Sequence, residues 1–262
     1  MDFVEIEYRE NFYMVEPHSH DHYELYFQLS GTREFFLKDK MFVLPPNCLC
    51  VIPPFSLHKT EGGAYERINI NVSENLLKKE EIRFLKECAT RCVLRLDDEY
   101  LPVVLALLKE GSALKAMKPK LKKDYELSIV QTILYFLQKQ TLSPLGEASS
   151  APPIEESADP MVLKLVFHLN ENYKEEITLE KLCAKFFLSK ATLCSRFKKK
   201  MHCSIMEYLF RVRLNKAKAL LVNSTKSIDE ISYLCGFSSA NYFSLIFKKS
   251  IGLSPLNYRK TR

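Results

Sequence analysis

The sequence lacks the features that mark secreted, membrane-spanning and zinc-binding proteins. Its first ten residues, MDFVEIEYRE, contain no basic stretch followed by an apolar one, so they predict no secretory signal. The longest apolar run, Tyr100–Leu108, has nine residues, whereas a membrane helix needs about 20. The eight cysteines form no pair of C-x-x-C units, which argues against a zinc module. We therefore expect a cytoplasmic protein with reduced, mostly buried thiols and no membrane partner.

Acidic residues are scarce in the last hundred residues. Residues 161–262 contain 7 Asp and Glu against 19 Lys and Arg, whereas residues 1–160 contain 25 against 19. A basic segment joined to an acidic one is typical of a nucleic-acid-binding domain fused to another domain, although a solvated basic surface would have the same composition. With 47% hydrophobic residues, the chain has enough apolar material for a folded core.

The composition divides the chain into two domains and a linker. Residues 141–160, TLSPLGEASSAPPIEESADP, contain four prolines and four serines, so they predict an exposed linker. Residues 1–140 begin with short segments rich in aromatic and β-branched residues, which predict a β-barrel, and continue with helices; the fold class expected is α+β. In the helix predicted over 121–139, one apolar stripe could be core or a dimer contact, and we favour the dimer contact; the stripe comprises Leu127, Val130, Ile133, Leu134 and Leu137.

Residues 161–262 contain an internal repeat. The segment Thr178–Lys200 aligns with Ser227–Ser250, and Phe197 falls on Phe247. Each copy predicts a short helix, a tight turn and a second helix, which is the helix-turn-helix pattern whose second helix enters the major groove. The segment Ser204–Ser224 predicts one long helix between the copies. This region is therefore expected to be an all-α domain of two helix-turn-helix units.

The long helix and the second copy carry a family resemblance. RVRLNKAKALL (211–221), followed by SIDEISYLCGFSSANYFSLIFKKSIGLSPLNYRK (227–260), resembles the signature of AraC/XylS-type transcriptional regulators, and the resemblance covers Met161–Arg262. It implies an activator, not an enzyme, that binds promoter double-stranded DNA as a homodimer. The further partners that it implies are RNA polymerase and a small-molecule effector, with a sugar as the leading class.

The family pattern assigns the DNA contacts to residues of this sequence. Base contacts are expected on the exposed face near the start of each second helix, at Lys190, Ala191, Cys194, Ser195, Ala240, Asn241, Ser244 and Leu245. Phosphate contacts are expected from Lys198, Lys199, Lys248, Lys249 and Arg259. Neither base-contacting face carries an arginine, so readout of DNA shape is expected to contribute to specificity.

Two turn positions depart from the family pattern. Phe187 stands where the first turn often has Gly, and His202 where Gly commonly closes the first reading helix, whereas the second copy keeps Gly252. A left-handed conformation at a residue other than glycine is unfavourable by about 1–2 kcal/mol. The second copy also has Gly236, which is expected to supply the positive φ that ends its first helix.

The N-terminal segment resembles the cupins. PHSHDHYELYFQLSG (17–31) has the spacing of the first cupin motif, and LPPNCLCVIPPFSLHKTEGG (44–63) resembles the second. The resemblance implies a cupin-like jelly roll that binds the effector, and its metal-ligand positions, which would hold one divalent transition metal, fall on His18, His20, Glu24 and His58. Further effector candidates are Tyr26, Gln28 and Arg33.

Three alternatives remain open for this segment. The histidines and the carboxylate could form a metal-binding sensor, or an enzyme such as a metal-dependent oxygenase or isomerase, fused to the DNA-binding domain. They could instead only close the rim of the barrel through hydrogen bonds. In a third reading the protein binds DNA constitutively and the barrel only dimerises.

Overall fold

The computed structural model describes residues 2–10, 16–37, 40–114, 117–141 and 159–261, so most of the linker predicted over 141–160 lies outside the described residues. In chain order the elements are β1 (Val4–Glu10), β2 (Tyr23–Ser30), β3 (Arg33–Leu37), β4 (Lys40–Leu44), β5 (Cys48–Ile52), β6 (His58–Glu61), β7 (Glu66–Val72), η1 (Glu74–Leu76), α1 (Lys79–Arg91), β8 (Leu94–Arg95), α2 (Leu101–Ala113), α3 (Pro119–Thr141), α4 (Pro160–Glu171), α5 (Leu179–Phe186), α6 (Lys190–Met201), α7 (Ile205–Asn223), α8 (Ile228–Leu234), α9 (Ala240–Ile251) and α10 (Pro255–Lys260). The predicted α+β class is confirmed.

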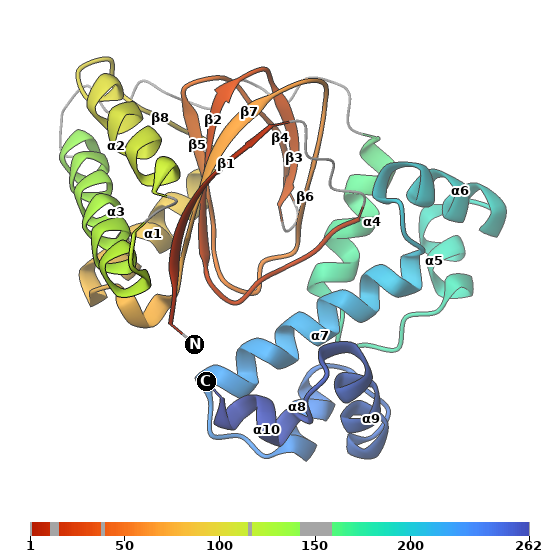
Figure 1. Cartoon of the computed structure of the whole chain (residues 1–262). Coiled ribbons are helices and arrows are strands. Elements are labelled where there is room, and N and C mark those ends of the chain that lie inside the picture. Colours follow the sequence, from red (N-terminus) through yellow and green to blue (C-terminus); the bar gives the residue numbers. More distant parts are fainter. Residues whose placement is uncertain (1, 11–15, 38–39, 115–116, 142–158, 262) are drawn as a thin grey trace.

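The strands form two antiparallel sheets (Figure 1). The first sheet has the order β1-β7-β2-β5-β8 and the second the order β4-β3-β6. Among the described strands no ladder joins the two sheets, because β2 pairs with β5 and β7 whereas β3 pairs with β4 and β6. The hydrogen bonds therefore form two sheets and no closed barrel, an arrangement consistent with the cupin-like domain that the sequence predicts.

The two faces of β2 have different environments. Leu25 and Phe27 pack against α1, α2 and α3 in one core, whereas Tyr26 points into a second core between the two sheets. Because side chains alternate along a strand, Glu24 and Gln28 share the face of Tyr26, and both are buried. The polar face of β2 therefore points inward, between the sheets.

Helix α3 belongs to the core of the N-terminal half, and the expected dimer contact along its apolar stripe is wrong. Figure 1 shows α3 beside α2, and both helices contact β1. Four stripe residues are buried within the chain, namely Val130, Ile133, Leu134 and Leu137, and Leu127 packs against the same core. The stripe is wide because it covers both a sheet and a neighbouring helix, and a subunit contact is not needed to bury it.

The C-terminal half consists of helices among its described residues. Helices α5 and α6 form the first helix-turn-helix unit, α8 and α9 form the second, and α7 joins them (Figure 1). The side chains of Ser189 and Ser239 cap α6 and α9, because each accepts a hydrogen bond from a backbone N–H in the first turn. Ser204 and Glu207 form a reciprocal capping box at the start of α7. These local signals explain why the repeat was readable in the sequence.

The turns of the two units use different residues for the same backbone conformation. Phe187 has a φ of 53° and its side chain is 92% exposed, and His202 has a φ of 58°. The second unit uses Gly236, with a φ of 76°, and a Cβ added there would lie 2.6 Å from the carbonyl oxygen of Tyr173. The positive φ expected at Gly236 is confirmed, and the first unit forms left-handed turns at Phe187 and His202 without glycine.

The composition raised two questions, whether a helix could span a membrane and whether the cysteines are free and buried. No helix among the described residues is long and apolar enough to cross a membrane. All eight cysteines are free; six are buried, and Cys183 and Cys194 are partly exposed. Burial raises the pKa of the Cys88 thiol to about 12, so this thiol is protonated and acts as a small apolar side chain.

Candidate functional site

Helix α9 presents one exposed and one buried face, as the periodicity predicted. Asn241 is exposed and the Leu245 side chain is 69% exposed, whereas Phe243 and Phe247 are fully buried. The Phe243 ring lies 4.8 Å from the ring of Phe237 and 5.4 Å from that of Phe247. The buried face therefore fixes the helix, and the exposed face is available for contact.

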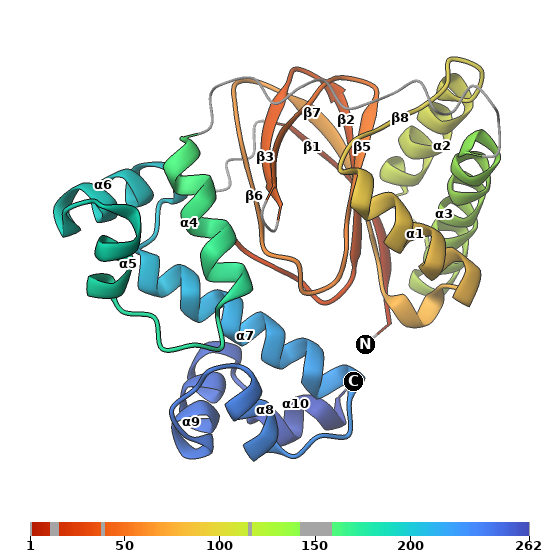
Figure 2. The ribbon, with the colours of Figure 1, turned by 180° about the vertical axis from the view of Figure 1, so that it is seen from behind.

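Helix α6 repeats this arrangement in the first unit. Lys190, Ala191 and Ser195 are exposed, and Cys194 is partly exposed, whereas Leu193 is buried. In the second unit the remaining candidates, Ala240 and Ser244, are partly exposed. Figures 1 and 2 show α6 and α9 together on the side of the molecule that lies away from α1, α2 and α3. Both helices that carry the predicted base contacts therefore lie on one side of the protein.

The five predicted phosphate contacts divide into two groups. The four lysines in the last turns of α6 and α9 are exposed, and these are Lys198, Lys199, Lys248 and Lys249. The guanidinium of Arg259 instead donates hydrogen bonds to the carbonyl oxygens of Leu221, at 3.3 Å, and Lys226, at 2.6 Å. Arg259 therefore fastens α10 to the end of α7, which makes it a weaker phosphate candidate than the lysines.

Residues that sequence reasoning missed join the two halves of the chain. The Lys200 ammonium, at the end of α6, lies 2.9 Å from a Glu34 oxygen and 3.1 Å from a Glu61 oxygen. The Ser19 hydroxyl donates to the side-chain oxygen of Asn215 on α7, at 2.6 Å. Apolar side chains of the sheet region also enter the core of the first unit, namely Phe36, Met41 and Leu57.

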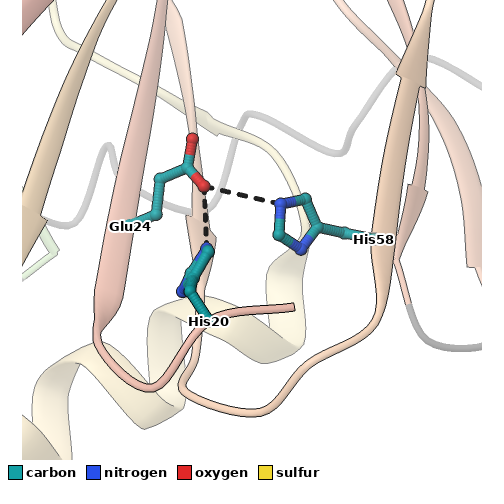
Figure 3. A group of neighbouring side chains, drawn as sticks. All are labelled: His20, Glu24 and His58. Atoms are coloured by element: carbon teal, nitrogen blue, oxygen red, sulfur yellow. Dashed lines mark hydrogen bonds and ion pairs between the residues drawn. The ribbon is translucent and has the colours of Figure 1, made fainter. Parts of the chain in front are cut away.

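Three of the four predicted metal ligands converge between the two sheets (Figure 3). Glu24 comes from β2, His58 from the start of β6, and His20 from the loop before β2. The Glu24 Oε2 atom lies 2.9 Å from His20 Nε2 and 3.5 Å from His58 Nε2. Among the described residues, His20, Glu24 and His58 form the group whose three metal-ligating atoms all lie within 4.8 Å of one another.

The surroundings orient both imidazoles toward Glu24. His20 Nδ1 lies 2.8 Å from the carbonyl oxygen of His22, and His58 Nδ1 lies 3.0 Å from that of Ser56. With an ion bound, each Nδ1 could keep its hydrogen and each Nε2 could offer its lone pair to the ion, whereas an Nε2 that donates to Glu24 carries a hydrogen itself. Two imidazoles and one carboxylate are a donor set that suits a divalent transition metal, so these residues fit the predicted ion.

Burial and hydrogen bonds set the charges in this group. Burial alone would raise the pKa of Glu24, but bonds from His20 and His58 outweigh it and hold the pKa well below its usual range. Burial, and then the neighbouring His58, lower the pKa of His18 to about 3, so the His18 ring is neutral. The His18 ring centroid lies 4.3 Å from that of His58, beside the group. The fourth predicted ligand is therefore a neighbour of the three that converge.

The other effector candidates are buried and engaged within the chain. The Gln28 amide donates to the carbonyl oxygen of Ser30, and an Arg33 nitrogen donates to that of Gly62 at 2.9 Å. The ring of Tyr26 lies 4.5 Å beneath the guanidinium of Arg67, on β7. Sequence reasoning missed Arg67, because its place beside β2 depends on the β2–β7 register.

Two family models match separate parts of the chain. The family model for an AraC-like ligand binding domain matches residues 2–110, and that for a helix-turn-helix domain matches residues 182–261. The HTH-type transcriptional activator RhaS of Escherichia coli O1:K1 / APEC is 26% identical over 251 residues, which are 94% of this chain and 87% of RhaS.

Two further proteins resemble the C-terminal half. The uncharacterized HTH-type transcriptional regulator YdiP of Escherichia coli strain K12 is 36% identical over 102 residues, which are 39% of this chain and 34% of YdiP, so the match spans about a third of that protein. The crystal structure of the DNA-binding domain of AdpA in complex with a target DNA is 30% identical and covers 40% of this chain and 93% of that one, with a TM-score of 0.38.

Proposed function

Because the chain is an AraC/XylS-type transcriptional regulator with an N-terminal ligand-binding domain, we propose that it activates transcription by binding promoter DNA through α6 and α9. The observation that carries the proposal is that both second helices lie on one side of the molecule (Figure 1) and that each has exposed residues at its predicted base-contacting positions. With α7 between them, one chain can read two neighbouring segments of the major groove. The name of RhaS, a transcriptional activator, supports the activating sign.

The proposed contacts separate affinity from specificity. Asn241 can pair with the edge of an adenine and Lys190 with a guanine, whereas Ala191 and Leu245 offer apolar contact to thymine methyl groups. The four exposed lysines supply charge to the phosphates and carry no sequence information. The homodimer remains an expectation from the sequence, and contact with RNA polymerase an expectation from the family resemblance.

We predict opposite binding defects for two α9 variants. Lys248→Ala should weaken binding to all DNA sequences about equally and should lower the slope of log affinity against log salt concentration by about 1. Asn241→Ala should leave that slope unchanged and relax the preference at one base pair, where an Asn–adenine pair contributes about 1–3 kcal/mol of discrimination. Both are measured by titrating the full chain into a randomised operator library at several salt concentrations.

A lysine far from α6 and α9 supplies the control for this experiment. Lys109→Ala removes one exposed positive charge from α2 and should change neither the slope nor the base preference. If Lys248→Ala loses affinity at its preferred site alone, Lys248 reads sequence rather than charge. If Asn241→Ala keeps its base preference, the proposed reading face of α9 is wrong.

A second candidate function is metal sensing, which the convergence of His20, Glu24 and His58 favours. The residues would hold the ion by two imidazole nitrogens and one carboxylate, and the ion would supply a positive charge where Glu24 is buried. The group is next to the contact between the halves, because His18 and His58 exchange backbone hydrogen bonds and Ser19 is bonded to α7. An ion here could therefore change how α7 is held.

We expect a transition metal ion to stabilise the folded protein. At 100 times its dissociation constant, an ion that binds only the folded state adds about 2.7 kcal/mol to the free energy of unfolding. The experiment is a melting screen of metal-stripped protein with zinc, nickel, manganese and a panel of sugars. The result expected for a metal is a rise in melting temperature that Glu24→Gln abolishes and that His168→Gln, on α4, retains.

The number of metal ions per chain that remain after dialysis tests the site independently of protein stability. One ion per chain in the parent protein, and none in Glu24→Gln, would support the metal site. A rise in melting temperature that occurs with a sugar and equally in both variants would assign the effector to a different site. No rise with any metal would contradict metal sensing.

A further inference from the structure

A cleft of about 610 Å³ lies between the two halves of the chain, outside the sites described above. Its walls come from the N-terminal segment, from the turn before β6 that contains Pro53 and Phe55, and from η1 with α1. The opposite wall is the last turn of α7, where Val222 lies on the surface of the cleft. This volume falls within the range typical of small-molecule sites, about 300–1,000 Å³.

The cleft is acidic in a protein whose net charge is positive. Three carboxylates, those of Asp2, Asp21 and Glu74, line it together with one ammonium, that of Lys86. The Glu74 carboxylate has no ion-pair partner within the part of the chain that the structure describes. An excess of negative charge at a concave site attracts a cationic ligand.

A buried hydroxyl supplies an observation independent of the carboxylates. Tyr23 lines the cleft, is 0% exposed, and its hydroxyl has no hydrogen-bond partner among the described residues. Buried tyrosine hydroxyls usually find such a partner. Burial, and then the negative charge of Glu74, raise the pKa of Tyr23, so the hydroxyl is neutral and able to accept a hydrogen bond from a ligand. A donor group brought in by a ligand would satisfy it.

The spacing of the carboxylates favours an organic cation over a metal ion. Among the described residues, only His20, Glu24 and His58 bring three metal-ligating atoms within 4.8 Å of one another, so the three cleft carboxylates are too far apart to share one ion. Separate ammonium groups on one aliphatic chain can reach separate carboxylates. Pro53, Phe55 and Val222 provide apolar surface for the carbon chain between them.

We propose that this cleft binds an aliphatic polyamine. Its ammonium groups lie at Asp2, Asp21 and Glu74, one N–H donates to the Tyr23 hydroxyl, and its methylene groups lie on the apolar wall. Because the cleft is lined from both halves, the bound polyamine strengthens the contact between the ligand-binding half and α7. The proposal does not depend on the metal group or on the base contacts of α6 and α9.

The test is isothermal titration of the full chain, without DNA, with spermidine at low salt. We expect saturable binding of one spermidine per chain, weakened about tenfold by the combined change Asp2→Asn and Glu74→Gln, because two ion pairs at the surface are lost. The matched control changes Glu99 and Glu110 to Gln; both are exposed, lie outside the cleft, and should leave the affinity unchanged. Magnesium chloride at equal charge should not compete with spermidine.

Tyr23→Phe provides a second test, whose expected result differs from that of a folding defect. This change removes only the unpartnered hydroxyl, so the melting temperature should stay the same or rise, while spermidine affinity falls. Absence of saturable binding overturns the proposal. Equal weakening in the control pair, or full competition by magnesium, also overturns it, because either result means diffuse attraction to surface charge.

Discussion

Leu134→Asp should unfold the N-terminal half of the protein. Leu134 is 1% exposed and lies in the core shared by α3, α2 and the five-stranded sheet. Truncating such a leucine alone removes about 2–5 kcal/mol of stability, and a carboxylate left without a partner in the same place adds a desolvation penalty. A domain stable by about 5–15 kcal/mol would lose most of its margin. Urea denaturation followed by circular dichroism measures the loss.

The neighbouring residue on α3 provides the control. Tyr135 is 62% exposed, so Tyr135→Asp should shift the free energy of unfolding by no more than about 0.5 kcal/mol. Sedimentation of both variants separates core from subunit contact. A Leu134→Asp chain that stays folded and only loses self-association would mean that the α3 stripe faces another subunit after all.

Phe243→Ala should lower the free energy of unfolding by about 3–5 kcal/mol, because it leaves a cavity at a fully buried site. The lost ring is packed between those of Phe237 and Phe247, so several aromatic contacts disappear at once. Binding to every DNA sequence should weaken in proportion to the unfolded fraction, with no change in the preferred base. Melting curves and library binding on the same sample measure both.

Leu245→Ala on the exposed face is the matched comparison for Phe243→Ala. Since the Leu245 side chain is 69% exposed, its truncation should leave the melting temperature nearly unchanged. If Leu245→Ala melts early, or if Phe243→Ala is stable but reads a different base, the two faces of α9 have been assigned in reverse.

The helix-turn-helix units could be predicted from sequence because their signals are local. Ser189 and Ser239 cap the helices that follow them, and Gly236 makes a turn that a Cβ would obstruct. The turn could be located even where the sequence departs from the family pattern, since Phe187, which stands in place of Gly, adopts the left-handed conformation that this position of the repeat requires. Each of these features depends on residues within a few positions of one another.

The ligand-binding half was predicted less completely because its contacts are long-range. The spacing of the first cupin motif identified His20 and Glu24 as candidate metal ligands, and the second motif identified His58. The neighbours of Glu24 on β7 were missed: Asn69 donates to its carboxylate and Arg67 lies 3.8 Å from it. Both come from a strand more than 40 residues away in the chain, and only the strand order places them there.

Periodicity alone also could not say what covers an apolar face or what holds a basic cluster. The α3 stripe looked the same whether it met a sheet or another subunit. Lys200 belongs to the run Lys198–Lys200 and resembles a phosphate contact in sequence, yet it is held by Glu34 and Glu61 from the other half. Such assignments require the tertiary partner, which neither spacing nor charge specifies.

Helix α7 fixes more than the distance between two helices. Its 19 residues include no Gly or Pro, and at about 1.5 Å per residue it is about 28 Å long. In the proposed mode of binding, once α6 lies in its groove, α9 meets the next segment at an effective concentration set by this stiff connection and not by the amount of protein in solution. An operator with half a helical turn inserted between its subsites carries the same bases, but the second subsite faces away from α9. The proposed mode of binding therefore predicts that spacing on the DNA is as much a part of the recognised sequence as the bases themselves.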